Sequence, residues 1–352
     1  MRLLITGGAG FVGANLACGL AARHPDWQLV ALDNLHRRGS ELNLARLREA
    51  GVKFVHGDVR QREDLLGVGA IEALLECSAE PSALAGLDDG PDYVVAANLM
   101  GAYHCLELAR RHGAQFLFMS TSRVYPIAPL RELLVAEDET RLRLLDDQAI
   151  PGASAAGIAE SFPLAGARTL YGATKLGAEL LVTEYREAYG LRAIINRCGV
   201  LAGPWQMGRV DQGVFSHWML AHHFRRPLSY IGFGGHGKQV RDLLHVEDLL
   251  ELIDEQLAAP EHWDGHTVNV GGGTGCSLSL LETTGLCTEI TGHRLEVGTI
   301  AATRPGDIPV YVSDCTALGA LTGWRPRHTA REILTDLHAW IAAHERELER
   351  AL

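Results

Sequence analysis

A tyrosine and a lysine four residues apart are the pair of side chains best suited to move a proton in this sequence. They stand in the run Tyr171-Gly172-Ala173-Thr174-Lys175, and this spacing places both on one face of a helix. A tyrosine with an ordinary pKa of ~10 is a poor base at neutral pH, but a nearby ammonium favours its anion. The pair therefore predicts a site where Tyr171 exchanges a proton with a substrate hydroxyl.

A hydroxyl at the end of a predicted strand gives this pair a partner. The run Met119-Ser120-Thr121-Ser122-Arg123-Val124-Tyr125 contains the end of the strand expected at 116–120. The carboxyl ends of strands in open α/β sheets face the crevice in which ligands bind. A Tyr-x-x-x-Lys spacing is common on amphipathic helices, so the hydroxyl is what favours a catalytic interpretation. In that interpretation Thr121 donates a hydrogen bond to the reacting oxygen.

A glycine loop follows the first predicted strand. Residues 2–6 lead into Gly7-Gly8-Ala9-Gly10-Phe11-Val12-Gly13 and then into a helical pattern. Such glycines allow a tight turn and bring backbone N–H groups close to a pyrophosphate, whose charge the helix N-terminus favours. Asp33, twenty residues after Gly13, can accept both ribose hydroxyl hydrogens and so favours NAD. NADP stays open because Arg37 and Arg38 follow closely.

Further positions are expected to contact the dinucleotide. Asp58, in His56-Gly57-Asp58-Val59 after the third predicted strand, is expected to flank the adenine. The run Glu76-Cys77-Ser78-Ala79-Glu80-Pro81 after the fourth strand is expected to line the cofactor cleft. The full set of expected cofactor contacts is Gly7, Gly10, Phe11, Val12, Gly13, Asp33, Asn34, Asp58, Val59, Cys77, Ser78, Ala79, Asn98, Tyr171, Lys175 and Cys198.

The elements that carry these residues alternate between short apolar strands and longer helices through the first ~200 residues. This alternation buries a parallel sheet between two layers of helices. It predicts an α/β fold with a Rossmann-type doubly wound parallel sheet and a smaller, mixed α/β C-terminal substrate lobe. Strands are expected at 2–6, 28–33, 53–57, 71–77, 116–120 and 192–197, and helices at 12–23, 93–112 and 171–189.

The domain organisation follows from where the alternation weakens. After Pro204, glycine-rich turns at 232–237 and 271–273 interrupt the chain. We expect an NAD-binding Rossmann domain over 1–204, with an insertion at 126–170 near the active site. Long connections of this kind are often lids or substrate walls. Residues 205–352 are expected to form mainly the substrate-binding lobe, with some segments returning to the Rossmann domain.

Composition excludes several classes of function. The chain has 352 residues, of which 47% are hydrophobic and 21% charged, as in ordinary globular proteins. Its formal net charge of −11 gives no long-range attraction for nucleic acid or an anionic membrane. No apolar run approaches the roughly 18 to 20 residues that span a bilayer, and the glycine loop comes too early for a signal peptide. We predict a cytoplasmic protein with no nucleic-acid or membrane partner.

Cysteine and histidine usage argues against a disulfide scaffold and a metal site. The seven cysteines are scattered and never spaced Cys-x-x-Cys. Of sixteen histidines only His222 and His223 adjoin, and neighbours on a helix point to different faces. We expect no metal ion.

Taken together, these residues make the sequence resemble the extended short-chain dehydrogenase/reductase family, in its nucleotide-sugar epimerase and dehydratase branch, over essentially the whole chain. Two later runs, Asp211-Gln212-Gly213 and 237–248, resemble most the CDP-tyvelose (CDP-paratose) 2-epimerases of that branch, and the long insertion before Tyr171 fits them too. The family's glycine loop, ribose acid and catalytic Ser/Thr, Tyr and Lys fall on Gly7, Gly10, Gly13, Asp33, Thr121, Tyr171 and Lys175.

The resemblance implies a nucleotide-diphosphate sugar as substrate. The family's diphosphate-binding arginines carry over onto Arg241 and Arg304, and a guanidinium fork suits paired phosphate oxygens. The resemblance also implies a homodimer through the helices at 93–112 and 171–189. Two runs depart from the family pattern: 76–81, where Glu80 could change the charge of the pocket, and 196–200, where sugar contacts stay open. Expected substrate contacts are Thr121, Ser122, Arg123, Gln239, Arg241 and Arg304.

Several reactions fit this resemblance. In an epimerase the sugar carbon gives a hydride to NAD, the transient keto-sugar presents its other face, and the hydride returns. In a 4,6-dehydratase of this branch an acidic pair follows the catalytic Thr, whereas here Ser122-Arg123 stands there. Epimerisation is therefore favoured over a dehydratase or decarboxylase reaction. A net oxidoreductase with exchangeable cofactor and a non-catalytic NAD-binding sensor stay open, although a sensor has little need of Thr121, Tyr171 and Lys175 together.

Overall fold

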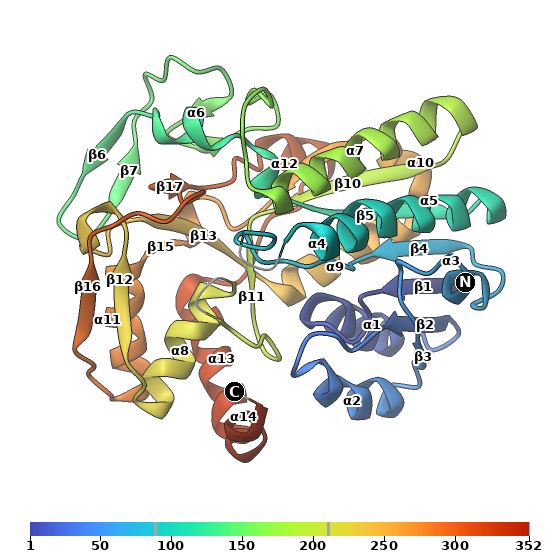
Figure 1. Ribbon diagram of the computed structural model, residues 1–352, viewed down its shortest axis with the longest axis horizontal. Coiled ribbons are helices and arrows are strands. Elements are labelled where there is room, and N and C mark those ends of the chain that lie inside the picture. Colours follow the sequence, from blue (N-terminus) through green and yellow to red (C-terminus); the bar gives the residue numbers. More distant parts are fainter. Residues whose placement is uncertain (88–89, 210–211, 352) are drawn as a thin grey trace. The chain divides into compact units, whose positions relative to one another are not determined.

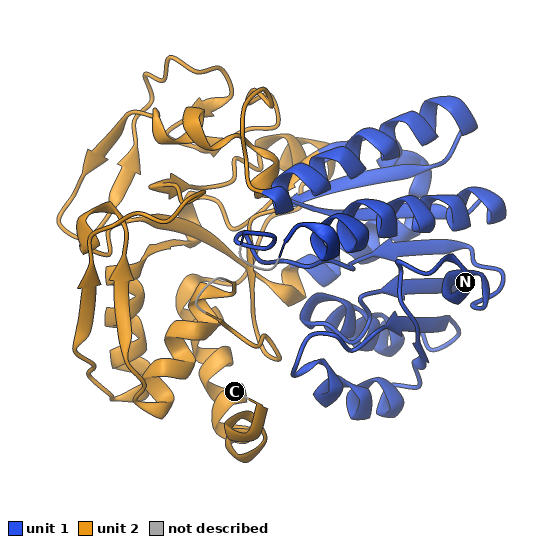
Figure 2. Cartoon of the chain, in the orientation of Figure 1, with its two compact units in different colours: residues 1–121, 170–197, 249–267 blue, residues 122–169, 198–248, 268–352 orange. Residues whose placement is uncertain are grey.

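The computed structural model describes residues 1–87, 90–209 and 212–351, and its contacts divide the chain into two compact units (Figure 2). Neither unit is a continuous stretch of sequence. Unit 1 comprises Met1–Thr121, Leu170–Arg197 and Leu249–Thr267, and unit 2 comprises Ser122–Thr169, Cys198–Asp248 and Val268–Leu352.

This division differs from the boundary expected at residue 204. The segment Ser122–Thr169 groups with unit 2 and not with the first 121 residues. The reason is backbone pairing: Leu142 N–H donates to the Lys238 carbonyl (2.9 Å), and Ile158 N–H donates to the Val312 carbonyl (2.8 Å). Pairing of this kind joins segments far apart in sequence, which local patterns do not reveal.

Unit 1 is built on a seven-stranded sheet with the order β14-β10-β5-β4-β1-β2-β3. The pairs β1–β2, β2–β3, β1–β4 and β4–β5 are all parallel. From β1 the chain builds outward first to one side and then to the other, which confirms the doubly wound Rossmann-type fold. The strands are β1 (Arg2–Thr6), β2 (Gln28–Asp33), β3 (Lys53–His56), β4 (Ala73–Glu76), β5 (Gln115–Thr121), β10 (Ala193–Cys198) and β14, which begins in unit 1 at Thr267 and ends at Val270.

The helices of unit 1 place the glycine loop and the Tyr-Lys pair. The helix expected at 93–112 contains one π-helical turn, η2, and ends at Gly113 in the left-handed conformation. Figure 1 shows α5 and α7 lying along each other, and the Tyr185 hydroxyl on α7 donates to Glu107 on α5 (2.7 Å). The elements are α1 (Phe11–Arg23), η1 (Ser40–Leu42), α2 (Asn43–Glu49), α3 (Arg62–Leu66), α4 (Asp92–Val95), η2 (Ala96–Met100), α5 (Gly101–His112), α7 (Leu170–Tyr189), α9 (Val246–Ala258) and α10 (Pro260–Trp263).

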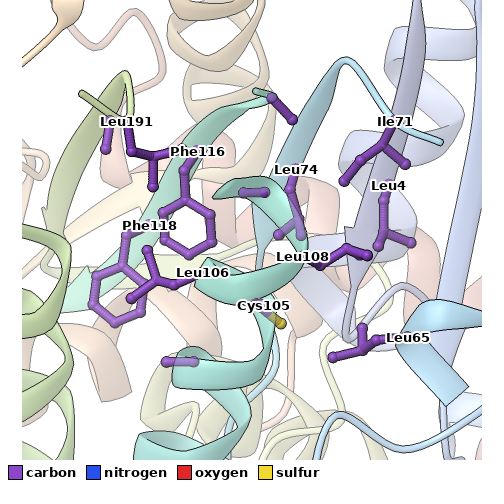
Figure 3. Close-up of a cluster of buried hydrophobic side chains, with 14 of the residues drawn as sticks. Leu4, Leu65, Ile71, Leu74, Cys105, Leu106, Leu108, Phe116, Phe118 and Leu191 are labelled. Carbon is purple, nitrogen blue, oxygen red and sulfur yellow. The ribbon is translucent and has the colours of Figure 1, made fainter. Parts of the chain in front are cut away.

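The core of unit 1 lies between the sheet and helices α5 and α7 (Figure 3). Because side chains alternate along a strand, Leu74 of β4 and Phe116 and Phe118 of β5 point to the same face and pack with Leu106 of α5. Burying one such side chain contributes about 1.5–3 kcal/mol. This packing holds the helices firmly against the strands that carry the site.

Unit 2 is mixed α/β, as predicted for the second lobe, but it was wrongly expected to be the smaller one: it spans more residues than unit 1, because Ser122–Thr169 belongs to it. Its main sheet has four strands: β13 pairs parallel with β11 and β17 and antiparallel with β15. Among the described residues, no helix is both long enough and apolar enough to cross a membrane. The elements are η3 (Ser122–Val124), α6 (Ile127–Arg131), β6 (Val135–Glu137), β7 (Leu142–Leu144), β8 (Ala153–Ser154), β9 (Gly157–Ile158), β11 (Val200–Ala202), α8 (Val214–Phe224), β12 (Leu228–Ile231), η4 (Phe233–Gly235), β13 (Val240–His245), η5 (Thr274–Cys276), β15 (Ser277–Ser279), α11 (Leu280–Thr291), β16 (Val297–Ile300), β17 (Val310–Tyr311), α12 (Thr316–Thr322), α13 (Ala330–Ala343) and α14 (Glu345–Ala351).

Candidate active site

The glycine loop joins β1 to α1, and close packing requires glycine at two of its positions. A Cβ atom on Gly7 would lie 2.7 Å from the Cys77 carbonyl oxygen, and one on Gly13 would lie 2.2 Å from the Gly7 carbonyl oxygen. At Gly10 the added atom would meet little besides the Gly7 oxygen at 3.1 Å. The backbone at Gly10 is thus open to close approach, as a pyrophosphate at the N-terminus of α1 requires. These residues fit NAD.

Asp33 ties the end of β2 to this loop. Its Oδ2 accepts the Ala9 N–H (3.0 Å) and its Oδ1 accepts the Leu35 N–H (2.8 Å). Burial raises the pKa of Asp33, although these N–H groups work in the opposite direction. A carboxylate has about four acceptor positions, so Asp33 can also accept hydrogen bonds from ribose hydroxyls.

Asp58 lies in a small polar cluster after β3. It accepts hydrogen bonds from Asn34 Nδ2 (2.9 Å) and from Arg60 Nε and Nη2 (3.0 and 2.7 Å), and the Arg60 guanidinium lies 4.8 Å from the ring centre of Tyr93. Burial favours the neutral acid, but Arg60 and Asn34 lower the pKa of Asp58 to about 2. Asp58 therefore stays ionised at neutral pH at the position where the adenine is expected. Sequence reasoning missed Arg60 and Tyr93, since neither belongs to a recognisable motif.

Asn98 organises the loop after β4. Its Oδ1 accepts the Glu80 N–H (2.8 Å), and its Nδ2 donates to the Glu80 carbonyl and to Thr174 Oγ1 (3.2 Å each). The side chain is buried within the π-helical turn. Asn98 therefore holds the loop that carries Cys77, Ser78 and Ala79 against the first turns of α7, while its expected contact with the cofactor stays a prediction.

The three expected catalytic residues all belong to unit 1. Thr121 ends β5, and Tyr171 and Lys175 stand on the first turns of α7. Tyr171 is half-buried, whereas Thr121 and Lys175 are buried. Their elements are therefore those that sequence analysis assigned to them.

A buried network fixes α7 against the strands. Glu179 Oε1 accepts hydrogen bonds from the Ser120 hydroxyl (2.5 Å) and from Arg197 Nε (3.1 Å), and its Oε2 accepts one from Arg197 Nη2 (2.7 Å). These contacts connect α7 with the ends of β5 and β10. Sequence analysis left the role of residues 196–200 open, and the structure shows that Arg197 is engaged in this internal ion pair.

Lys175 is surrounded by three groups of unit 1. Its Nζ lies 3.2 Å from Glu76 Oε2 and 4.5 Å from the ring centre of Phe118. Burial lowers the pKa of Lys175, but the charges of Glu76 and Tyr171 outweigh it, so the pKa lies above its ordinary value. The interaction is mutual. A Tyr171 phenolate stabilises the Lys175 ammonium, and the ammonium in turn stabilises the phenolate.

In unit 2, arginines gather at the loop Arg304-Pro305-Gly306-Asp307. Arg241 Nη2 donates to Asp307 Oδ1 (2.9 Å) and to the Ile308 carbonyl (2.7 Å), and Arg123 Nη1 donates to the Gly306 carbonyl (3.1 Å). Burial lowers the pKa of Arg241 to about 10; Asp307 raises it and Arg123 lowers it further. The structure thus brings Arg123 and Arg241 to the loop that contains Arg304.

Other expected contacts in unit 2 are placed as follows. Ser122 and Arg123 line a small cavity together with Tyr125, Thr169 and Gly306. Gln239 is buried and donates to the Ile231 carbonyl (3.1 Å). Cys198 is buried at the end of β10. Asp211, from the Asp-Gln-Gly run, lies outside the described residues.

Among the described residues, two histidines and a glutamate lie close together, which sequence analysis did not anticipate. The nearest ligand atoms of His245, Glu247 and His328 lie within 4.8 Å of one another. However, His245 Nδ1 accepts the Glu247 N–H (3.1 Å), so its Nε2 carries the proton. The rings of His245 and His328 also stack, with centres 4.2 Å apart, so their nitrogen lone pairs do not converge. This geometry does not suit a metal ion.

The dinucleotide-binding loop between β1 and α1 and the Tyr171–Lys175 pair on α7, both in unit 1, define an NAD-dependent enzyme. The chain belongs to the NAD dependent epimerase/dehydratase family, which matches residues 3–271. NAD is accordingly its cofactor.

Comparison with individual proteins adds detail. The chain is 30% identical to the CDP-paratose 2-epimerase of Salmonella typhi over 97% of this chain and 100% of that protein. It is 33% identical to a dTDP-glucose 4,6-dehydratase of Mycobacterium tuberculosis over 70% of this chain and 66% of that protein. The solved UDP-glucose 4-epimerase of Thermus thermophilus, in complex with NAD, has a TM-score of 0.77 and 26% identity, and covers 97% of this chain and 99% of its own.

Proposed function

We propose that this protein epimerises a nucleotide-diphosphate sugar through a transient keto-sugar, in the manner of a CDP-tyvelose (CDP-paratose) 2-epimerase. The observation that carries the choice is Arg123, two residues after Thr121, with its guanidinium on the Gly306 carbonyl. Loss of water from a sugar needs an acid to protonate the leaving hydroxyl. A guanidinium keeps its proton in proteins, so Arg123 is unsuited to that step. The similarity to the 2-epimerase over its full length supports the same choice.

The roles of the side chains follow from their chemistry. Tyr171 takes the proton of the sugar hydroxyl and later returns it, Thr121 donates a hydrogen bond to the reacting oxygen, and Lys175 holds the nicotinamide ribose and stabilises the Tyr171 anion. Bound NAD supplies a hydride acceptor that gives the hydride back. Arg241 and Arg304 hold the substrate diphosphate, because paired guanidinium donors match phosphate oxygens.

A cytoplasmic homodimer is part of this proposal. Large apolar side chains on η2, α5 and α7 are exposed: Met100, Tyr103, Leu180 and Tyr189. An exposed apolar surface on two neighbouring helices supports pairing of two copies through them. All seven cysteines are free thiols, which supports a reducing compartment.

The test is incubation of the purified protein, with no added NAD, with CDP-, UDP- and GDP-sugars in D2O, followed by NMR of the sugar ring protons. We expect one stereocentre to invert without uptake of deuterium, because the hydride returns to its own carbon. The Tyr171→Phe variant should lose about a hundredfold or more of this turnover while binding NAD normally. Loss of water or carbon dioxide would instead identify a dehydratase or decarboxylase, and a need for stoichiometric added NAD would identify an oxidoreductase.

A further inference from the structure

Glu76 occupies an unusual position for a carboxylate. It is the last residue of β4, and the strand register pairs it with Thr6 of β1 and Phe118 of β5. Paired residues of a parallel sheet point to the same face, so Glu76 ends the row that begins with Leu74 on the apolar face covered by α5 and α7. Its side chain is 1% exposed. A carboxylate buried in this way is costly unless it has a charged partner.

That partner is Lys175. The two side chains meet at 3.2 Å, and the ammonium also lies over the Phe118 ring. Glu76 thus accepts one of the three hydrogens of the ammonium. The other carboxylate oxygen, Oε1, is buried without a hydrogen-bond partner among the described residues. Burial raises the pKa of Glu76, whereas Lys175 and the N–H and hydroxyl of Ser78 lower it. The charged partner of this carboxylate is therefore Lys175.

Among the groups around this pair, Glu76 is the one whose negative charge balances the Lys175 ammonium. Tyr171 of α7, Cys77 after β4 and Cys105 of α5 face it. Burial, and next the charge of Glu76, raise the pKa of Cys105 well above its ordinary value, so Cys105 stays a neutral thiol. Glu179, one turn further along α7, is engaged by Arg197. Before Tyr171 ionises, Glu76 is the negative charge in contact with the Lys175 ammonium.

We propose that Glu76 is a positioning residue for Lys175, which keeps the ammonium charged and fixed at the carboxyl end of β4 so that it can hold the nicotinamide ribose and stabilise the Tyr171 anion. This inference rests on the roles proposed above for Tyr171 and Lys175. Without Glu76, burial favours the neutral amine. The neutral amine has one fewer hydrogen to donate and no charge to offer the tyrosine. A purely structural ion pair would not link cofactor binding to the protonation of Lys175.

The test uses Glu76→Gln, which keeps an oxygen that can accept from Lys175 but removes the charge. Calorimetry on protein from which bound NAD has been removed would give the NAD dissociation constant between about pH 6.5 and pH 9. We expect the wild-type constant to be nearly flat and the variant to match it at the lower pH. Removing an opposite charge at this distance lowers a pKa by about one to three units, so the variant should bind NAD about tenfold more weakly near pH 9. Glu72→Gln is the matched control, because Glu72 directly precedes β4 and is 69% exposed.

Two further variants separate positioning from structure. In a Lys175→Met background, Glu76→Gln should add no pH-dependent loss of NAD affinity, because the group through which Glu76 acts is gone. If Glu76→Gln fails to fold, Glu76→Asp, which keeps the charge, should retain a flat profile. A pH-independent loss, or the same loss in the Lys175→Met background, would overturn the proposal. Since no sugar is involved, these results are independent of the Tyr171→Phe turnover test, whose failure would instead refute the proposed function.

Discussion

Helix α7 carries two buried ion pairs one turn apart, and they are built differently. Glu179 receives hydrogen bonds on both oxygens, from Ser120 and from Arg197. Glu76, the partner of Lys175, has one oxygen without a hydrogen-bond partner among the described residues. An arginine cannot shed its proton when its partner is lost, but a buried lysine can. The first pair is therefore a fixed anchor, whereas the charge of the second can respond to its surroundings.

The largest effect is expected from breaking the anchor. Glu179→Gln leaves the Arg197 guanidinium charged and buried, and breaking a buried pair in this way costs about 3–5 kcal/mol of unfolding free energy. Chemical denaturation monitored by circular dichroism measures it. The double variant Glu179→Leu/Arg197→Met should regain much of the loss, because no isolated charge remains. A loss below about 1 kcal/mol in the single variant would show that the anchor contributes little.

A smaller effect is expected when the responsive pair loses its acid. In Glu76→Gln the lysine can become neutral as the pH rises towards 9, so the loss of unfolding free energy near pH 9 should be about 1–2 kcal/mol, within the range for an unsatisfied buried polar group. The same denaturation experiment, run beside Glu179→Gln, compares the two pairs directly. Equal losses in the two variants would contradict the distinction between anchor and responsive pair.

The smallest effect is expected at Asp58, which extends the comparison to a more accessible carboxylate. Its pKa is about 2 in the folded protein and ordinarily ~3.9. Because folding lowers the pKa, the contact stabilises the protein above about pH 4, and the contribution is lost as the pH falls towards 2. Arg60→Ala should remove about 0.5–1 kcal/mol at neutral pH and less near pH 2. Urea denaturation at both pH values tests this. If the variant lost more unfolding free energy near pH 2 than at neutral pH, the predicted pH dependence would have the wrong sign.

Sequence analysis succeeded where the relevant interactions are local. Strands β1 and β2 begin and end at the predicted residues, because a glycine loop and a terminal acid mark them. Strand β14 was not expected, since its four residues come after the alternation has weakened. In the site, the Tyr171–Lys175 spacing was visible because both residues lie on one helix. The partners Glu76 and Arg197 were not, because they come from other strands and a contact of that kind depends on register.

The interleaving of the two units has a consequence for how the protein is made. Unit 1 includes Leu249–Thr267, so its last segment is translated after two segments of unit 2, Ser122–Thr169 and Cys198–Asp248. Domains usually fold as units during synthesis, yet here the sheet that contains β1 is complete only after α9 and β14 have been made. A segment of unit 2, Ser122–Thr169, emerges well before unit 1 can close. Ribosome-bound chains that end before Leu249 should therefore hold only an incomplete unit 1.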